Sequence, residues 1–282
     1  MRVPKFVAFC LIGLLWIGII GKVYAQETKT ETKQEQPAVV APLPVWKASD
    51  FRMVPVRVHL LRAPDTAAGT VLQATDIERI FKKANGIWHA AGVHLWVESI
   101  VSEMPASIEG HREDKELPLD ALLPLRPKES NSADCFNVYY IHAMSPNGIY
   151  MNRDALFVKE TAKLKEVPGG IDEPLPRVSA HELGHGMGLP HRQNTTNLMA
   201  SGTTGTSLNA AEIEIVRTTL VRFPWVLAPD EFLKAADKQA KAGNNEAART
   251  AYEALLELPT PSSVSKQATD GIKRLDRQKK TK

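Results

Sequence analysis

The sequence predicts an α+β fold whose first part resembles an α/β unit, followed by a small helical extension at the C-terminal end. Residues 51–101 show strand, helix and strand patterns in succession, which favours a parallel crossover unit. A strongly β-forming run, FNVYYIHAM, follows at residues 136–144. Helical periodicity returns after Pro229, where the composition also changes.

The first 25 residues predict an export signal. Arg2 and Lys5 precede the apolar run FVAFCLIGLLWIGIIG, and Val23-Tyr24-Ala25 places small residues where a signal peptidase cleaves. The alternative is an uncleaved membrane anchor formed by residues 6–21, which is just below the usual spanning length of about 20 residues. Both interpretations place the remaining chain outside the cytoplasm, in the periplasm or the medium. If the signal is cleaved, no stable membrane insertion is expected.

Charge and cysteine content argue against a nucleic-acid-binding protein and against a protein stabilised by disulfides. The chain has 35 basic and 32 acidic residues, but three basic residues lie in the signal, so the mature chain is close to neutral. Because no basic patch with interleaved aromatic residues is present either, a nucleic-acid partner is not expected. Cys10 also lies in the signal, which leaves Cys135 alone and excludes an intramolecular disulfide. We expect Cys135 to be a small buried apolar residue.

The main domain is predicted at residues 46–228, after a flexible linker at residues 26–45 that is polar and then rich in proline. MVPVRVHLLR predicts a first strand after Phe51. Thr75-Asp76-Ile77-Glu78 predicts a capping box that opens a helix, and Gly92 is expected to end it. A second strand is predicted at residues 93–101.

The middle of this domain is expected to hold a long loop and further strands. Residues 102–133 are rich in charge and proline, with one short helical candidate at residues 119–125. The strand at residues 136–144 is expected to be central in the sheet. Asn147-Gly148 predicts a turn, and residues 155–158 predict another short strand.

The stretch HELGHGMGLPH, residues 181–191, contains the candidate metal ligands. His181 and His185 are four residues apart, so on a helix both imidazoles lie on one face and can bind one zinc ion. His191 supplies a third ligand if the chain turns back after the helix, and Gly188 allows that turn because glycine adopts the left-handed conformation. Three protein ligands leave a fourth position for water, which is the catalytic arrangement.

Two other features of this stretch need separate explanations. Glu182 is next to a ligand but about 100° around the helix from it, where a general base can take a proton from the water. Gly184 and Gly186 weaken the helix by about 2 kcal/mol together, and their positions in the sequence do not explain them. We expect metal binding to offset this loss.

His181, Glu182, His185, Gly188 and His191 fill every fixed position of H-E-x-x-H-x-x-G-x-x-H, and Met199 follows at the distance of a Met-turn. The chain therefore resembles the metzincin zinc peptidases, and the segment around NLMASGTTGTS is most similar to their matrixin-like bacterial members. Arg192 and Ser201 depart from better-known subfamilies. Without a tyrosine at position 201, no tyrosine ligand is expected.

This resemblance implies a twisted mixed sheet with two long helices, above a lower subdomain that contains the Met-turn. A closing helix is expected at residues 209–221. The resemblance further implies that Met199 forms an apolar floor under the metal and that residues 200–207 form a wall of the substrate pocket. It also implies that the strand at residues 155–158 is the sheet edge along which a peptide substrate lies.

Residues 229–282 predict a helical extension. Two helices are expected around Gly243-Asn244-Asn245, with a partial third helix at residues 263–276 and a solvated tail from residue 274 onward. The pair resembles a single tetratricopeptide-type hairpin, a unit that normally needs stacking neighbours. The extension therefore either packs on the main domain or binds a protein partner.

The sequence favours a secreted zinc endopeptidase that acts on polypeptides with Glu182 as general base. One alternative is a zinc amidase that acts on cell-wall peptide material, and another is a non-catalytic binding protein stabilised by zinc. No cysteine precedes the domain outside the signal, so latency through a cysteine bound to the metal is not expected. The five other histidines show no ligand spacing: His59, His89, His94, His111 and His142.

Overall fold

The computed structural model describes residues 44–64, 66–107, 115–151 and 155–280. The predicted signal, the alternative anchor at residues 6–21 and most of the predicted linker lie outside these ranges. Within them, no helix combines the length and the apolar character needed to cross a membrane.

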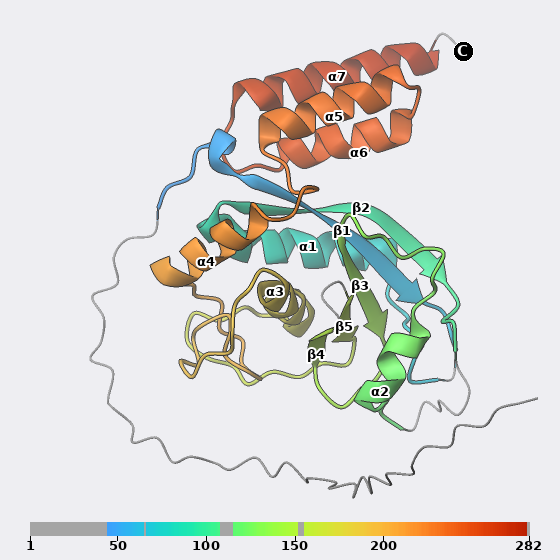
Figure 1. The fold of residues 1–282 in the computed structure, drawn as a ribbon, viewed down its shortest axis with the longest axis vertical. Helices are drawn as coiled ribbons and strands as arrows, with labels where there is room; N and C mark the ends of the chain where they lie inside the picture. Colours follow the sequence, from blue (N-terminus) through green and yellow to red (C-terminus); the bar gives the residue numbers. More distant parts are fainter. Residues whose placement is uncertain (1–43, 65, 108–114, 152–154, 281–282) are drawn as a thin grey trace, which may run out of the picture. The chain divides into compact units, whose positions relative to one another are not determined.

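A five-stranded mixed sheet forms the centre of the fold, in the order β2-β1-β3-β5-β4 (Figure 1). Strands β1, β2, β3 and β5 run parallel to one another, and β4 runs antiparallel to β5. The strands are β1 (Arg52–Leu61), β2 (Val93–Glu103), β3 (Phe136–Ile141), β4 (Gly148–Met151) and β5 (Ala155–Lys159). The predicted α+β class is confirmed, although the third strand ends three residues earlier than expected.

The helices of the main domain follow the predicted order. They are α1 (Ala74–Trp88), α2 (Leu119–Leu122), α3 (Pro174–Gly186) and α4 (Ala210–Leu220), with 3-10 turns at Ala48–Asp50, His89–Ala91 and Leu123–Leu125. Helix α1 connects β1 to its parallel neighbour β2, as the strand, helix and strand pattern predicted. Helices α1 and α3 pack against one another.

The capping box was predicted two residues too late. Helix α1 begins at Ala74, and the carboxylate of Asp76 accepts a hydrogen bond from the backbone N–H of Gln73 at 2.8 Å. Asp76 therefore occupies the third helical position that the prediction gave to Glu78.

Alternate residues of β1 enter different hydrophobic clusters. Val54, Val56 and Val58 belong to the core beneath α1 and α3. On the opposite face, Met53 packs with the C-terminal helices, whereas Leu61 packs with the loops around α2. Because successive strand residues point to opposite faces, both faces of the sheet are covered.

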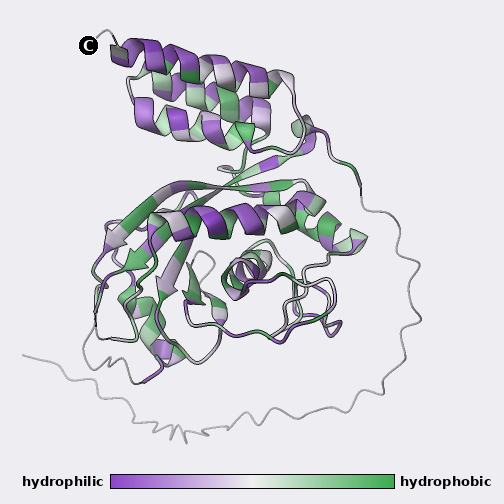
Figure 2. Cartoon of the chain, turned by 180° about the vertical axis from the view of Figure 1, so that it is seen from behind, coloured by the Kyte–Doolittle hydropathy of each residue, from purple (hydrophilic) through white to green (hydrophobic). Residues whose placement is uncertain are grey.

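The C-terminal extension consists of three helices, α5 (Pro229–Lys241), α6 (Asn245–Leu256) and α7 (Ser263–Lys280), each carrying hydrophilic and hydrophobic residues (Figure 2). Their shared core reaches Phe51 and Met53 of the main domain, and Phe232 lies edge-on to Trp96 at 4.8 Å. The predicted tail from residue 274 is helical as far as Lys280, and Leu275 is buried in this core, whereas residues 276–279 are exposed, as a solvated tail requires. The resemblance to a tetratricopeptide hairpin stays a prediction.

The predicted edge strand is also wrong. Residues 155–158 form the interior strand β5, and the edge is β4, which begins at the predicted Asn147-Gly148 turn. An interior strand is buried on both faces, as the continuous apolar run Ala155 to Val158 requires. Residues of β4 are all half-buried, as expected at an edge.

Candidate metal centre

Helix α3 places the first two candidate ligands and then ends abruptly. Pro174 occupies its first turn, where the missing N–H costs no hydrogen bond. The helix ends at Gly186, and Gly188 follows with a φ of 92°, in the left-handed region. The backbone N–H of Leu189 then bonds to the carbonyl of Gly184 at 2.9 Å. The chain thereby reverses direction towards His191.

The three histidines predicted as ligands converge on one point. The Nε2 atom of His185 lies 3.2 Å from that of His181 and 3.1 Å from that of His191. Two imidazole ligands of a tetrahedral zinc ion, each about 2.0–2.1 Å from the metal, have nitrogens about 3.3 Å apart. Among the described residues, this is the one group of three or more potential ligand side chains close enough to share an ion. The arrangement fits zinc.

Backbone carbonyls hold two of these imidazoles in the form that binds a metal. Nδ1 of His181 lies 2.8 Å from the carbonyl of Leu198, and Nδ1 of His185 lies 2.7 Å from that of Leu189. A carbonyl can only accept, so each Nδ1 carries the proton and each Nε2 presents a lone pair. Burial lowers the pKa of His181 to about 3 and also lowers that of His185, so both rings are neutral at pH 7.

Glu182 lies beside the ligands without joining them. Its Oε1 is 3.9 Å from Nε2 of His181, and its side chain accepts a hydrogen bond from the backbone of Tyr150 on β4. Burial raises the pKa of Glu182 to about 8, and the nearby Arg177 partly opposes this rise. A cation bound by the histidines would lower this pKa further, because it favours the carboxylate.

Met199 lies directly against the helix that carries the ligands. It is fully buried, and its backbone N–H donates to the side chain of Asn197 at 2.7 Å. A Cβ atom on Gly184 would lie 2.6 Å from the sulfur of Met199, and one on Gly186 would lie 2.8 Å from the ring of Phe136. Both glycines therefore allow close packing, which the sequence alone did not explain.

A buried polar network around Glu212 was not predicted. The Glu212 carboxylate is fully buried and accepts from Arg192 at 2.7 Å, from the Asn197 side chain at 2.9 Å and from the backbone of Asn209 at 2.9 Å. Asn209 and Glu212 form a capping box at the start of α4. Their spacing could have indicated the box, but not the partnership with Arg192. The network joins the residue after the third histidine to the Met199 turn.

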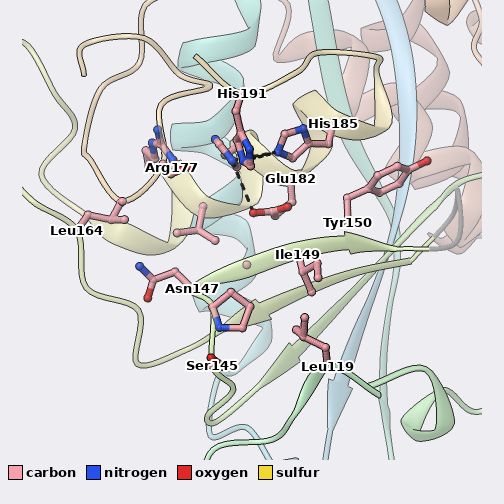
Figure 3. A pocket seen from close by; sticks show the side chains of 16 residues that line it. Leu119, Ser145, Asn147, Ile149, Tyr150, Leu164, Arg177, Glu182, His185 and His191 are labelled. Atoms are coloured by element: carbon pink, nitrogen blue, oxygen red, sulfur yellow. Dashed lines mark hydrogen bonds and ion pairs between the residues drawn. The ribbon is translucent and has the colours of Figure 1, made fainter. Parts of the chain in front are cut away.

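The candidate ligands open onto a cavity of about 750 Å³. It lies between α3, which carries Glu182 and His185, and the edge strand β4, which carries Ile149 and Tyr150 (Figure 3). Other lining residues come from the start of α2 and from distant loops: Leu119, Ser145, Pro146, Asn147, Leu164, Ser201 and Gly202. The cavity also contacts Arg177, a residue that sequence patterns did not single out.

The described histidines outside this group have structural partners. His59 contacts Glu103 at 2.7 Å, His142 contacts Glu160 at 2.6 Å, and His89 lies 3.1 Å from His94. His111 lies outside the described residues. Cys135 is buried and free, which confirms the prediction for it.

Comparisons with known proteins give distant likenesses. No protein-family model and no curated protein matches the sequence. A solved structure of mirolysin in complex with a compound is similar at 11% identity, with a TM-score of 0.43, covering 60% of this chain and 92% of that one. Metalloproteinase-II from Bacteroides fragilis is similar at 12% identity, with a TM-score of 0.37, covering 64% of this chain and 57% of that one. At these TM-scores the likeness carries no conclusion about activity, and the chemistry rests on the geometry of the site.

Proposed function

We propose that the protein is an exported zinc-dependent endopeptidase of the metzincin type. The observation that carries this proposal is the convergence of three imidazole Nε2 atoms beside a buried carboxylate that is not one of the ligands. A structural zinc site needs no such carboxylate, since its four positions are filled by ligands. Glu182 would have no purpose in a protein that only binds zinc for stability.

His181, His185 and His191 would hold the metal through Nε2. When bound, zinc lowers the pKa of a bound water towards about 7 and polarises the carbonyl of the scissile bond. Glu182 takes the proton from the attacking water and delivers it to the leaving amine. The backbone N–H of Tyr150 holds the Glu182 side chain towards the cavity. Met199 forms the apolar floor behind the ligands, and a polypeptide substrate lies along β4.

The test combines metal content with peptide cleavage. Mature wild type, Glu182→Gln and the surface control Glu246→Gln are measured for zinc per chain and for the rate of cleavage of a peptide library. We expect about one zinc in all three proteins and a loss of at least about 10²-fold in rate for Glu182→Gln alone. Glu246 is exposed on α6, so its substitution controls for the loss of one carboxylate.

Two results would contradict the proposal. Equal rates for wild type and Glu182→Gln would remove this carboxylate from the mechanism. Zinc binding without cleavage of any peptide, together with release of fragments from cell-wall material, would establish an amidase instead.

A further inference from the structure

A buried arginine shares the cavity with the candidate metal ligands. Arg177 precedes His181 by one helical turn on α3, and its side chain is only 2% exposed although it lines the cavity (Figure 3). The backbone rise over four residues is about 6 Å. Arg177 and the three histidines line the same cavity. Because residues of an extended peptide are about 3.3–3.6 Å apart, a substrate whose scissile bond lies at the histidines has its neighbouring residues in the cavity that Arg177 lines.

Arg177 makes no ion pair with a carboxylate in the part of the chain that the structure describes, although it lies near enough to Glu182 to oppose the rise in the pKa of that carboxyl. Its Nε donates to the carbonyl of Gly205 at 3.2 Å, and its Nη2 donates to that of Ala200. Both acceptors are neutral. Glu182 is the one carboxylate among the cavity-lining residues, and it is engaged with Tyr150 beside the metal site.

A purely structural interpretation explains only part of this arrangement. The two hydrogen bonds that hold the segment from Ala200 to Gly205 use Nε and one N–H of Nη2 of Arg177. They do not use Nη1. A neutral donor could hold the same carbonyls without the cost of burying a charge. The guanidinium offers parallel N–H groups that match the two oxygens of a carboxylate.

We infer that Arg177 is a specificity-determining residue that binds a carboxylate of the substrate next to the cleaved bond. This inference rests on the proposed peptidase function and names the substrate class as acidic peptides. The carboxylate can come from an Asp or Glu side chain or from the C-terminus of the substrate. In each case the carboxylate forms a charge-assisted hydrogen-bonded pair with Arg177.

The test begins with wild-type protein, so it does not depend on the folding of a variant. Cleavage sites are mapped in a peptide library, and matched peptides are then made with Glu or Gln, and Asp or Asn, at each position flanking the cut. All peptides are amidated at the C-terminus, and a parallel set has a free C-terminus. We expect kcat/KM at least tenfold higher for the acidic member of a pair at one flanking position. If the preference appears only with free C-termini, the terminal carboxylate is the ligand.

Three variants assign the preference to a residue. Arg177→Lys is expected to keep part of the acid-to-amide ratio, whereas Arg177→Met brings it close to one. Arg222→Met, at an exposed position, is expected to keep the wild-type ratio. Cleavage with no preference for acidic residues or free C-termini in wild type, or an unchanged ratio in folded Arg177→Met, would overturn the inference and leave the proposed function intact. Failure to cleave any peptide would overturn both.

Discussion

Replacing Gly184 by alanine tests whether helix propensity or packing against Met199 has the larger effect on the free energy of unfolding. Alanine stabilises a helix interior by about 1 kcal/mol relative to glycine, so propensity alone predicts a gain. In the structure, however, the new Cβ would lie 2.6 Å from the sulfur of Met199 and 3.2 Å from its methyl carbon. Met199 is fully buried, and the hydrogen bond that its backbone N–H donates to the Asn197 side chain fixes its backbone. Overpacking of this kind costs about 1–3 kcal/mol.

The expected net change for Gly184→Ala is therefore a loss of about 0–2 kcal/mol in the free energy of unfolding. Gly86→Ala on α1 is the matched control, because nothing lies within 4 Å of its added Cβ and the full gain of about 1 kcal/mol is expected. The two variants should differ by about 1–3 kcal/mol in urea unfolding of the metal-free protein. If Gly184→Ala is stabilised as much as Gly86→Ala, the contact with Met199 does not constrain the helix.

Two further perturbations test the electrostatics of the site. Glu212→Gln removes the charge that joins Arg192 to the Met199 turn. We expect the free energy of unfolding, measured in urea, to fall by about 1–3 kcal/mol, and zinc binding to become weaker. Unchanged values of both would show that the network is dispensable. In the metal-free protein, the folded pKa of Glu182 is raised from 4.5 to about 8, so its carboxylate destabilises the fold as the pH rises from 4.5 through 8. Glu182→Gln should match wild type near pH 4.5 and exceed its stability by on the order of 4 kcal/mol near pH 8. A difference that does not depend on pH would contradict the raised pKa.

The elements predicted well are those whose signals are local in the sequence. The crossover from β1 through α1 to β2 follows from period and spacing, as does the shared face of His181 and His185. The edge strand was misplaced because strand order depends on pairings between distant segments, and four half-buried residues at Gly148–Met151 carry little pattern. The end of α7 was missed because Leu275 becomes apolar core only through contact with the other C-terminal helices.

Arg177 shows the same limit within the site. On its helix it has no distinguishing spacing, and arginine is ordinarily exposed. It is buried because the carbonyls of Ala200 and Gly205, more than twenty residues later in the chain, close over its guanidinium. Neither carbonyl can be predicted from residue type, since every residue has a backbone carbonyl. The side chains of a site can be predicted from spacing, whereas the backbone groups that hold them cannot.

The turns at Gly188 and Met199 each place a backbone carbonyl against one of the histidines. Gly188 lets the chain bring His191 to the other imidazoles, and the same turn presents the carbonyl of Leu189 to Nδ1 of His185. The turn that positions Met199 likewise presents the carbonyl of Leu198 to Nδ1 of His181. Each turn therefore fixes the tautomer of one candidate ligand on α3, and a carbonyl that accepts from Nδ1 in this way favours metal binding through Nε2. A loop that kept the three histidines but lost either carbonyl would let that ring populate the tautomer with its proton on Nε2, and this tautomer cannot bind zinc through Nε2.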